Sequence, residues 1–146
     1  MDFKQSTMKK NTNPLLLLGL TLFCLQSFAQ QPAKAKKPFS DAVKAGGLLF
    51  VSGQLGINPF VQGKDDFRDE VRNALGNVER ILKRNGVSLK HVVNVTVYLK
   101  KLEQFDIFNE IYVQQFSDPF PARTCVIVKD LVQHANIEIS VVASSP

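Results

Sequence analysis

The chain has 146 residues, of which 45% are hydrophobic, and its 18 Lys and Arg outnumber its 13 Asp and Glu, for a formal net charge of +5. This length suits one compact domain. The excess positive charge lies before residue 38, so the remaining body is close to neutral. A neutral body gives no support for a nucleic-acid groove, and we expect no nucleic-acid partner.

The first 29 residues have the pattern of a secretory signal peptide. Lys9 and Lys10 precede an apolar run over residues 15–25, and the small residues Ser27 and Ala29 follow in the arrangement of a cleavage site. The run is too short to cross a hydrocarbon core of about 30 Å as a helix. We therefore expect cleavage after Ala29, export to the periplasm or the medium, and no stable association with a membrane. An N-terminal membrane anchor is the alternative.

Cleavage would leave a basic linker over residues 30–37 and a folded domain over residues 38–146. Only Cys125 would remain of the two cysteines, so the mature chain could form no internal disulfide. Its stability must then come from the core or from association. The apolar neighbourhood of Cys125 favours a buried structural thiol over a reactive one.

The first elements of the domain are two predicted strands. Residues 42–44 and 48–52 flank Ala45-Gly46-Gly47, which is a hairpin signal. The second strand is expected to stop at residues 53–56, and Asn58-Pro59 begins a polar turn.

Two amphipathic helices and a strand follow. From Phe67 the apolar residues recur at the three-four spacing of one helical face. Asp65 or Asp66 can cap the start of this helix, and Asn85-Gly86 ends it. Residues 91–99 form the clearest strand, and aromatic residues at helical spacing over 105–116 predict the second helix.

Two further strands, over residues 121–128 and 136–142, complete the domain, with a loop over 130–135 between them. Two helices over four or five strands make a two-layer α+β fold, with a mixed sheet and both helices on one face. The other face of the sheet must be buried by something else, and self-association is the simplest answer.

Two charges lie inside these last apolar strands: Arg123 and Glu138. A charge in a buried strand is costly unless it is paired or used. A fixed cation and a carboxylate can act as an anion clamp and an acid/base. They can equally form an internal ion pair, or keep an exposed strand edge from aggregating.

Five motifs in one order carry a resemblance to a known family. They are Pro38-Phe-Ser-Asp-Ala-Val43, Val51-Ser-Gly-Gln54, Asn109-Glu-Ile-Tyr112, Phe120-Pro-Ala-Arg-Thr-Cys-Val126 and Ile137-Glu-Ile139. Over residues 38–143 the chain resembles the Rid family, the YjgF-type reactive intermediate deaminases. The resemblance implies a chorismate-mutase-like subunit that assembles as a homotrimer, with sites in the clefts between subunits.

The resemblance also implies a reaction, the hydrolysis of 2-imino acids or their enamine tautomers to 2-keto acids and ammonia, with no metal or organic cofactor. Arg123 matches the family arginine that grips the substrate carboxylate, for which a planar guanidinium is suited. Glu138 matches the glutamate thought to handle water or to move a proton to the leaving nitrogen.

Supporting roles follow for four more residues. Backbone groups near Gly53 and Cys125 are expected to line the pocket, and a side chain at residue 53 would block that approach. Ser52 and Asn109 fall on family motif positions, although Asn109 can equally be a helix-surface amide. Arg123 and Cys125 are two residues apart on one strand, so their side chains share a face.

Two departures from the family pattern bear on activity. Phe39 is expected to line the pocket where the family's active deaminases usually have a tyrosine, so it keeps the ring and loses the hydroxyl. Asp41 replaces the more usual glutamine and adds a negative charge. Because acid–base partners contribute about 10²–10⁴-fold, the alternative is an exported trimeric small-carboxylate binding protein with little or no turnover.

Other candidate chemistries are weaker. His91 and His134 have no second ligand at metal spacing, so no metal site is predicted. The chain has no Gly-rich phosphate loop and no sequence context for a nucleophile elbow around Ser52. Endoribonuclease activity, attributed to some members of the family, fits poorly with a near-neutral body and export.

Overall fold

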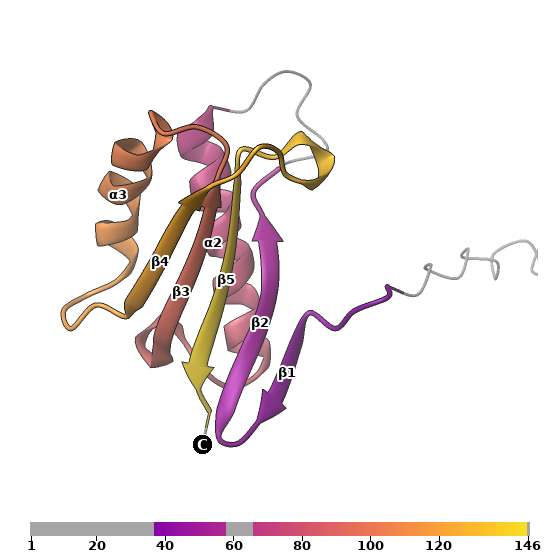
Figure 1. Ribbon diagram of the computed structural model, residues 1–146. Helices are drawn as coiled ribbons and strands as arrows, with labels where there is room; N and C mark the ends of the chain where they lie inside the picture. The colour runs from indigo at the N-terminus through magenta and orange to yellow at the C-terminus, as the bar shows by residue number, and fades with distance from the viewer. Residues whose placement is uncertain (1–36, 58–65, 146) are drawn as a thin grey trace, which may run out of the picture. The chain divides into compact units, whose positions relative to one another are not determined.

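The computed structural model describes residues 37–57 and 66–145. These residues form five strands and two helices: β1 (Ala42–Ala45), β2 (Leu48–Leu55), α2 (Phe67–Arg84), β3 (Val92–Leu99), α3 (Gln104–Gln115), β4 (Ala122–Ile127) and β5 (Ile137–Ser144) (Figure 1). Short 3-10 turns occur at η2 (Leu89–His91) and η3 (Val132–His134). The predicted signal peptide and nearly all of the linker lie outside the described residues. No helix in the described part is long and apolar enough to cross a membrane.

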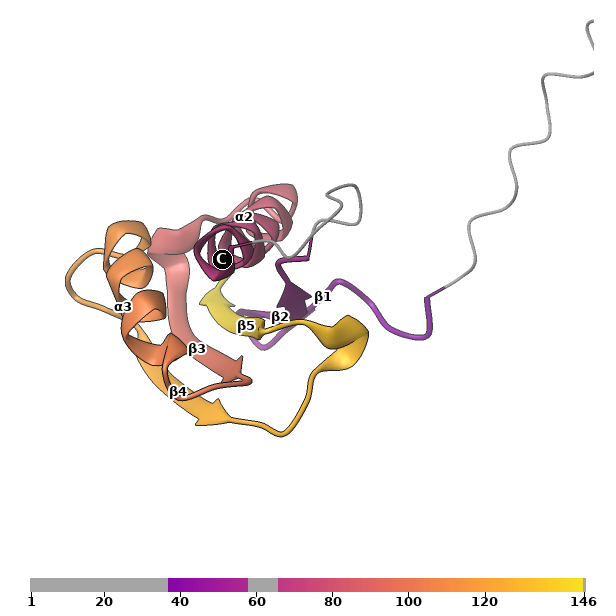
Figure 2. The ribbon, with the colours of Figure 1, turned by 90° about the horizontal axis from the view of Figure 1, so that it is seen from above.

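The strands form one mixed sheet in the order β1-β2-β5-β3-β4. Only β3 and β4 pair in parallel, because α3 carries the chain from the end of one back to the start of the other. Both helices cover the same face of the sheet, as the view from above shows (Figure 2). The predicted two-layer α+β fold, with a mixed sheet and two helices on one face, is confirmed.

Helix α2 begins and ends where the sequence predicts. Asp66 caps its start by accepting a hydrogen bond from Arg68 N at 3.1 Å, and its last turn is followed by Asn85 and by Gly86 at φ 80°. Its apolar stripe is buried against the sheet: Val71, Leu75, Val78 and Leu82. The three-four spacing thus fixes which face of the helix meets the core.

The core lies between the helices and one face of the sheet. Alternate residues of β3 and β5 face the helices and are buried: Val95, Val97, Leu99, Ile137, Ile139 and Val141. The intervening residues point to the other face, which no described helix covers. Large apolar side chains, Val43, Phe50 and Val126, are exposed there.

Strand β2 runs two residues beyond Gly53, so the predicted end of this strand is wrong. Its pairing with β5 passes from Val51 opposite Val141 to Gln54 opposite Ile139, with a register shift between them. Ser52 and Gly53 therefore share one place in the ladder as a β-bulge. The glycine marks an irregularity inside the strand, where the sequence pattern suggests an end.

A buried carboxylate fixes the start of β5 against helix α2. Glu70 is 3% exposed and accepts hydrogen bonds from Asn136 N at 2.6 Å and from Asn136 Nδ2 at 2.7 Å. Because Asn136 directly precedes β5, these bonds hold the beginning of the strand that carries Glu138. Charge-assisted hydrogen bonds of this kind compensate the burial of the carboxylate.

Candidate functional site

The Arg123 side chain extends from β4 toward helix α3. Arg123 pairs with the buried Val95 of β3, so its side chain is on the helix-covered face of the sheet. Its guanidinium carbon lies over three aromatic rings of α3, 4.6 Å from the Tyr112 centroid, 5.4 Å from Phe108 and 5.9 Å from Phe105. Among the described residues, no carboxylate oxygen lies within 4.0 Å of this guanidinium. The internal ion pair considered from the sequence is therefore absent there.

A pocket of about 400 Å³ lies in front of the guanidinium, and we call it the Arg123 pocket. One cation, one amide, one phenol and apolar groups line it: Asn109, Tyr112, Val113, Phe120, Pro121 and Arg123. Asn109 Oδ1 and Tyr112 Oη are buried and have no hydrogen-bond partner among the described residues. An uncompensated cation in a mostly apolar concavity is suited to a small carboxylate.

Glu138 points to the opposite face of the sheet. Its neighbours Ile137 and Ile139 are fully buried in the core, so alternation along β5 turns the Glu138 side chain to the face that the helices leave open. A second concavity of about 360 Å³, the Glu138 pocket, is lined by Phe39, Ser52, Gly53, Leu55, Val132, Gln133 and Glu138. Its carboxylate has no hydrogen-bond or ion-pair partner within the described part of the chain.

The bulge in β2 makes room for this carboxylate. A Cβ added at Gly53 would collide with Glu138 Oε1 and would lie 2.7 Å from Glu138 Cδ. Only glycine therefore permits the Glu138 side chain to lie across β2. A side chain at residue 53 would therefore obstruct the pocket by displacing the Glu138 carboxylate.

Ser52 lies in the wall of the Glu138 pocket and holds the chain segment beside it. Its hydroxyl donates a hydrogen bond to Ser40 O at 2.7 Å, and its backbone N–H donates to Asp41 O at 3.1 Å. These bonds hold the segment that carries Phe39 beside the bulge. The Ser52 hydroxyl is thus engaged with the backbone, and its contribution to the pocket is to position Phe39.

One chain does not bring Arg123 and Glu138 together, because they lie on opposite faces of one sheet and line different pockets. Cys125 shares the face of Arg123, as its spacing predicts, but it lines neither pocket. Burial raises the pKa of the Cys125 thiol, and the nearby Arg123 only partly opposes this effect. The thiol is therefore protonated at neutral pH.

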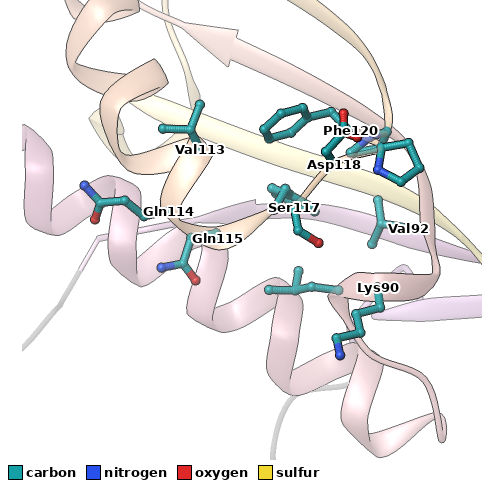
Figure 3. A pocket seen from close by; sticks show the side chains of 12 residues that line it. Lys90, Val92, Val113, Gln114, Gln115, Ser117, Asp118 and Phe120 are labelled. Carbon is teal, nitrogen blue, oxygen red and sulfur yellow. The ribbon is translucent and has the colours of Figure 1, made fainter.

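A third and larger cavity, of about 710 Å³, adjoins the Arg123 pocket (Figure 3). The end of α3, including Gln115, forms one side, and Lys90 and Val92 form the other. Val113, Phe120 and Pro121 line both this cavity and the Arg123 pocket. These shared walls place open space beside the residues that surround the cation.

The described residues contain no group of three His, Cys, Asp or Glu that could hold a metal ion.

Comparisons with known proteins identify the family. The family model described as Endoribonuclease L-PSP matches residues 29–145. The RutC family protein PH0854 of Pyrococcus horikoshii is 40% identical over 118 residues, which cover 80% of this chain and 94% of that protein. The chain belongs to the Rid family. A Rid relative from Dermatophagoides farinae, named 2-iminobutanoate/2-iminopropanoate deaminase, is 33% identical over 106 residues, 70% of this chain and 81% of its own length.

Solved structures of Rid proteins have the same fold. RidA from Psychrobacter sp. PAMC 21119 is similar with a TM-score of 0.69 and 33% identity, covering 77% of this chain and 92% of that one. E. coli TdcF, solved with bound serine, has a TM-score of 0.68 and 32% identity, covering 77% and 91%.

The pockets of this Rid chain also contain residues that the sequence did not single out as site residues. Tyr112 and Phe120 lie within the quoted motifs and could have been found there, since Tyr112 is three residues after Asn109 on one helical face. Val132 and Gln133 carry no such signal. Gln133 and His134 adopt left-handed backbone conformations, at φ 56° and 59°, which non-glycine residues seldom adopt.

Proposed function

We propose that this Rid protein hydrolyses 2-imino acids, or their enamine tautomers, to 2-keto acids and ammonia. The observation that carries the proposal is the Arg123 guanidinium, which faces a pocket with no carboxylate to neutralise it among the described residues. A 2-imino acid presents a carboxylate next to the carbon that water attacks. Arg123 would bind that carboxylate through two parallel N–H donors.

Glu138 would handle the water. Its carboxylate would take a proton as the water oxygen forms a bond to C2 of the imine. It would then return the proton to the imine nitrogen, which gives an intermediate with a hydroxyl and an amine on C2. Glu138 would next move the hydroxyl proton to the amine, and the C–N bond would break as the carbonyl forms, releasing ammonia. The unpartnered state of Glu138 supports this role, because its oxygens are not already engaged by donors among the described residues.

We further propose that the site is completed between subunits of a homotrimer. Arg123 and Glu138 face opposite sides of one sheet, so a cation from one copy and a carboxylate from the next can share one ligand only across an interface. Exposed apolar side chains border both half-sites: Phe39 and Val132 at the Glu138 pocket, Val113 and Phe120 at the Arg123 pocket. A head-to-tail contact of this kind closes into a ring.

The assembly is tested by a charge on the open face of the sheet. Phe50 is 44% exposed there, and Phe50→Glu is expected to lower the mass measured by light scattering from three chains toward one. Leu102→Glu is the matched control, because Leu102 is 70% exposed and lines neither half-site. A Phe50→Glu protein that remains trimeric contradicts a central role for this face.

The activity is tested with imino acids generated in situ by an amino-acid oxidase. The purified protein is expected to shorten their lifetime, and Arg123→Ala is expected to abolish the effect. Arg72→Ala is the control, since Arg72 is exposed and pairs with Asp69 at 2.9 Å. The proposal fails if several 2-imino acids decay no faster with the unmodified protein than without it.

One observation favours a second candidate, a trimeric small-carboxylate binding protein without turnover. Phe39 lines the Glu138 pocket and has no hydroxyl to help hold a water. If Phe39→Tyr greatly raises hydrolysis while 2-keto acid binding is unchanged, the binding function gains support. Rapid turnover by the unmodified protein rules it out.

We also propose that the protein is exported, because residues 1–29 have the pattern of a cleavable signal peptide. N-terminal sequencing of the protein from the medium or the periplasm is expected to begin at Gln30. Recovery only in the cytoplasm, with the first 29 residues attached, would contradict export.

A further inference from the structure

We infer that the aromatic face of helix α3 is a positioning device for Arg123, in which the Tyr112 ring holds the guanidinium toward its pocket without neutralising its charge. The inference deepens the proposed function and rests on it for the identity of the ligand. The geometry of the rings does not depend on that function.

The three rings of α3 lie close enough to the guanidinium for favourable cation–π interactions. A guanidinium interacts with the face of an aromatic ring within about 6 Å of its centroid, and all three rings meet this limit. Phe105, Phe108 and Tyr112 are three and four residues apart, so they share one face of α3. Tyr112 is the nearest, at 4.6 Å.

The Tyr112 ring is itself rigidly held. It is 4% exposed and lies 5.4 Å from the Phe108 centroid, 4.6 Å from Phe116 and 6.4 Å from Phe120. Aromatic pairs at these separations are favourable. A ring fixed on several sides can restrict the guanidinium to a narrow range of positions.

The choice of rings in place of a carboxylate matters for binding. An acidic partner would neutralise Arg123 and occupy the N–H donors that a ligand needs. Aromatic faces attract the flat side of the guanidinium and leave its edges free. Burial raises the pKa of Tyr112, an effect that Arg123 partly opposes, so the phenol stays uncharged at neutral pH and supplies no competing anion.

The test compares three variants of the full-length protein. NMR of the Arg123 Nε–H group reports its position and motion, and titration with pyruvate, a simple 2-keto acid, reports carboxylate affinity. Tyr112→Leu is expected to shift and broaden the Arg123 signal and to weaken pyruvate binding about tenfold. Tyr112→Phe keeps the ring and is expected to leave the Arg123 signal in place.

Phe116→Leu is the matched control. Phe116 is also buried, and its ring packs against Tyr112, but it is not among the rings that lie over Arg123. This variant loses core packing of the same kind and one of the rings against Tyr112, but it keeps the Tyr112 ring over the cation, so it is expected to shift the Arg123 signal less than Tyr112→Leu does. An equal effect of Phe116→Leu and Tyr112→Leu would overturn the inference, since both would then act only through the core.

The remaining outcomes are also decisive. An unchanged Arg123 signal and pyruvate affinity in Tyr112→Leu overturns the inference even if hydrolysis is found. If Tyr112→Leu does not fold, Phe105→Leu replaces it, because Phe105 is half-buried; a smaller shift supports the inference and none overturns it. If Tyr112→Leu shifts the Arg123 Nε–H signal but the unmodified protein hydrolyses no imine, the proposed function is contradicted and the positioning role of Tyr112 is supported.

Discussion

Adding a single methyl group at Gly53 should lower the activity of the protein and leave its fold intact. The residue lies in the bulge of β2, beneath the Glu138 side chain. A Cβ built there would collide with Glu138 Oε1 and would lie 2.7 Å from Cδ and 2.9 Å from Cγ. Gly53→Ala therefore forces the carboxylate to move.

The size of that movement follows from the contact distances. Ordinary van der Waals contact begins at 3.4 Å, so Cδ must shift from its 2.7 Å position by about 0.7 Å, and Oε1 by more. A misplacement of about 1 Å in a catalytic group costs on the order of 10²-fold in rate. Gly53→Ala is expected to lower kcat for imine hydrolysis by about that factor.

The affinity for pyruvate is expected to change little in Gly53→Ala, because Arg123 is proposed to hold the carboxylate of the ligand and the added Cβ would contact Glu138, not Arg123. Gly76→Ala is the control. An added Cβ at Gly76, within α2, meets nothing within 4 Å, so this variant should keep full activity. It should also be more stable to unfolding by about 0.5–1 kcal/mol, because alanine loses less backbone entropy in a helix.

The assay is imine decay under oxidase turnover, with thermal unfolding followed by circular dichroism in parallel. The steric role of Gly53 is refuted if Gly53→Ala hydrolyses imines at the rate of the unmodified protein. It is also refuted if activity falls only in proportion to the loss of folded protein.

Two further predictions concern buried groups. Glu70→Gln replaces an acceptor oxygen by an NH₂ group opposite a donor of Asn136, which should lower the free energy of unfolding by about 2–4 kcal/mol and Tm by roughly 10–20 °C. Glu79→Gln is the control, because Glu79 forms an exposed pair with Lys83, and it should change stability by about 0.5 kcal/mol or less. Equal melting curves for the two variants would contradict the role of Glu70. In a Cys24→Ser background, iodoacetamide should label Cys125 more slowly at pH 8 than a free cysteine, because a raised pKa lowers the thiolate fraction. The labelling rate should rise through a midpoint above the ordinary thiol value, and a midpoint at or below it would disprove the assigned burial.

The sequence predicts most of the fold because its apolar periodicities are regular. The stripe of α2 and the alternation of β5 leave little choice of which side faces the core. The bulge at Ser52-Gly53 could not be predicted in the same way, because a glycine in a strand pattern is compatible with either an end or an irregularity. The pairing with β5 decides between them, and such pairing depends on residues far away in the sequence.

The sequence suggests candidate residues for the site, and six of the seven line one of the two pockets, but it does not show how they are arranged in space. Strand β4 is an edge strand with exposed apolar side chains among its residues, so its sequence does not reveal which face Arg123 takes. The aromatic spacing over α3 predicts a core stripe, and nothing in that spacing shows that the same rings surround a cation. Glu70 reads as a favourable charge at a helix start, whereas its partner Asn136 is 66 residues away.

The placement of Arg123 and Glu138 on opposite faces predicts that two inactive variants can complement each other. In a ring of three subunits, each site would draw its cation from one chain and its carboxylate from the next, so Arg123→Ala and Glu138→Ala would disable different members of the same pair. Two inactive proteins, dissociated and reassembled together, should then regain activity, because every mixed ring contains one intact combination. Random mixing in equal amounts would restore about a quarter of the sites. A site formed within one chain could not show this complementation between two inactive variants.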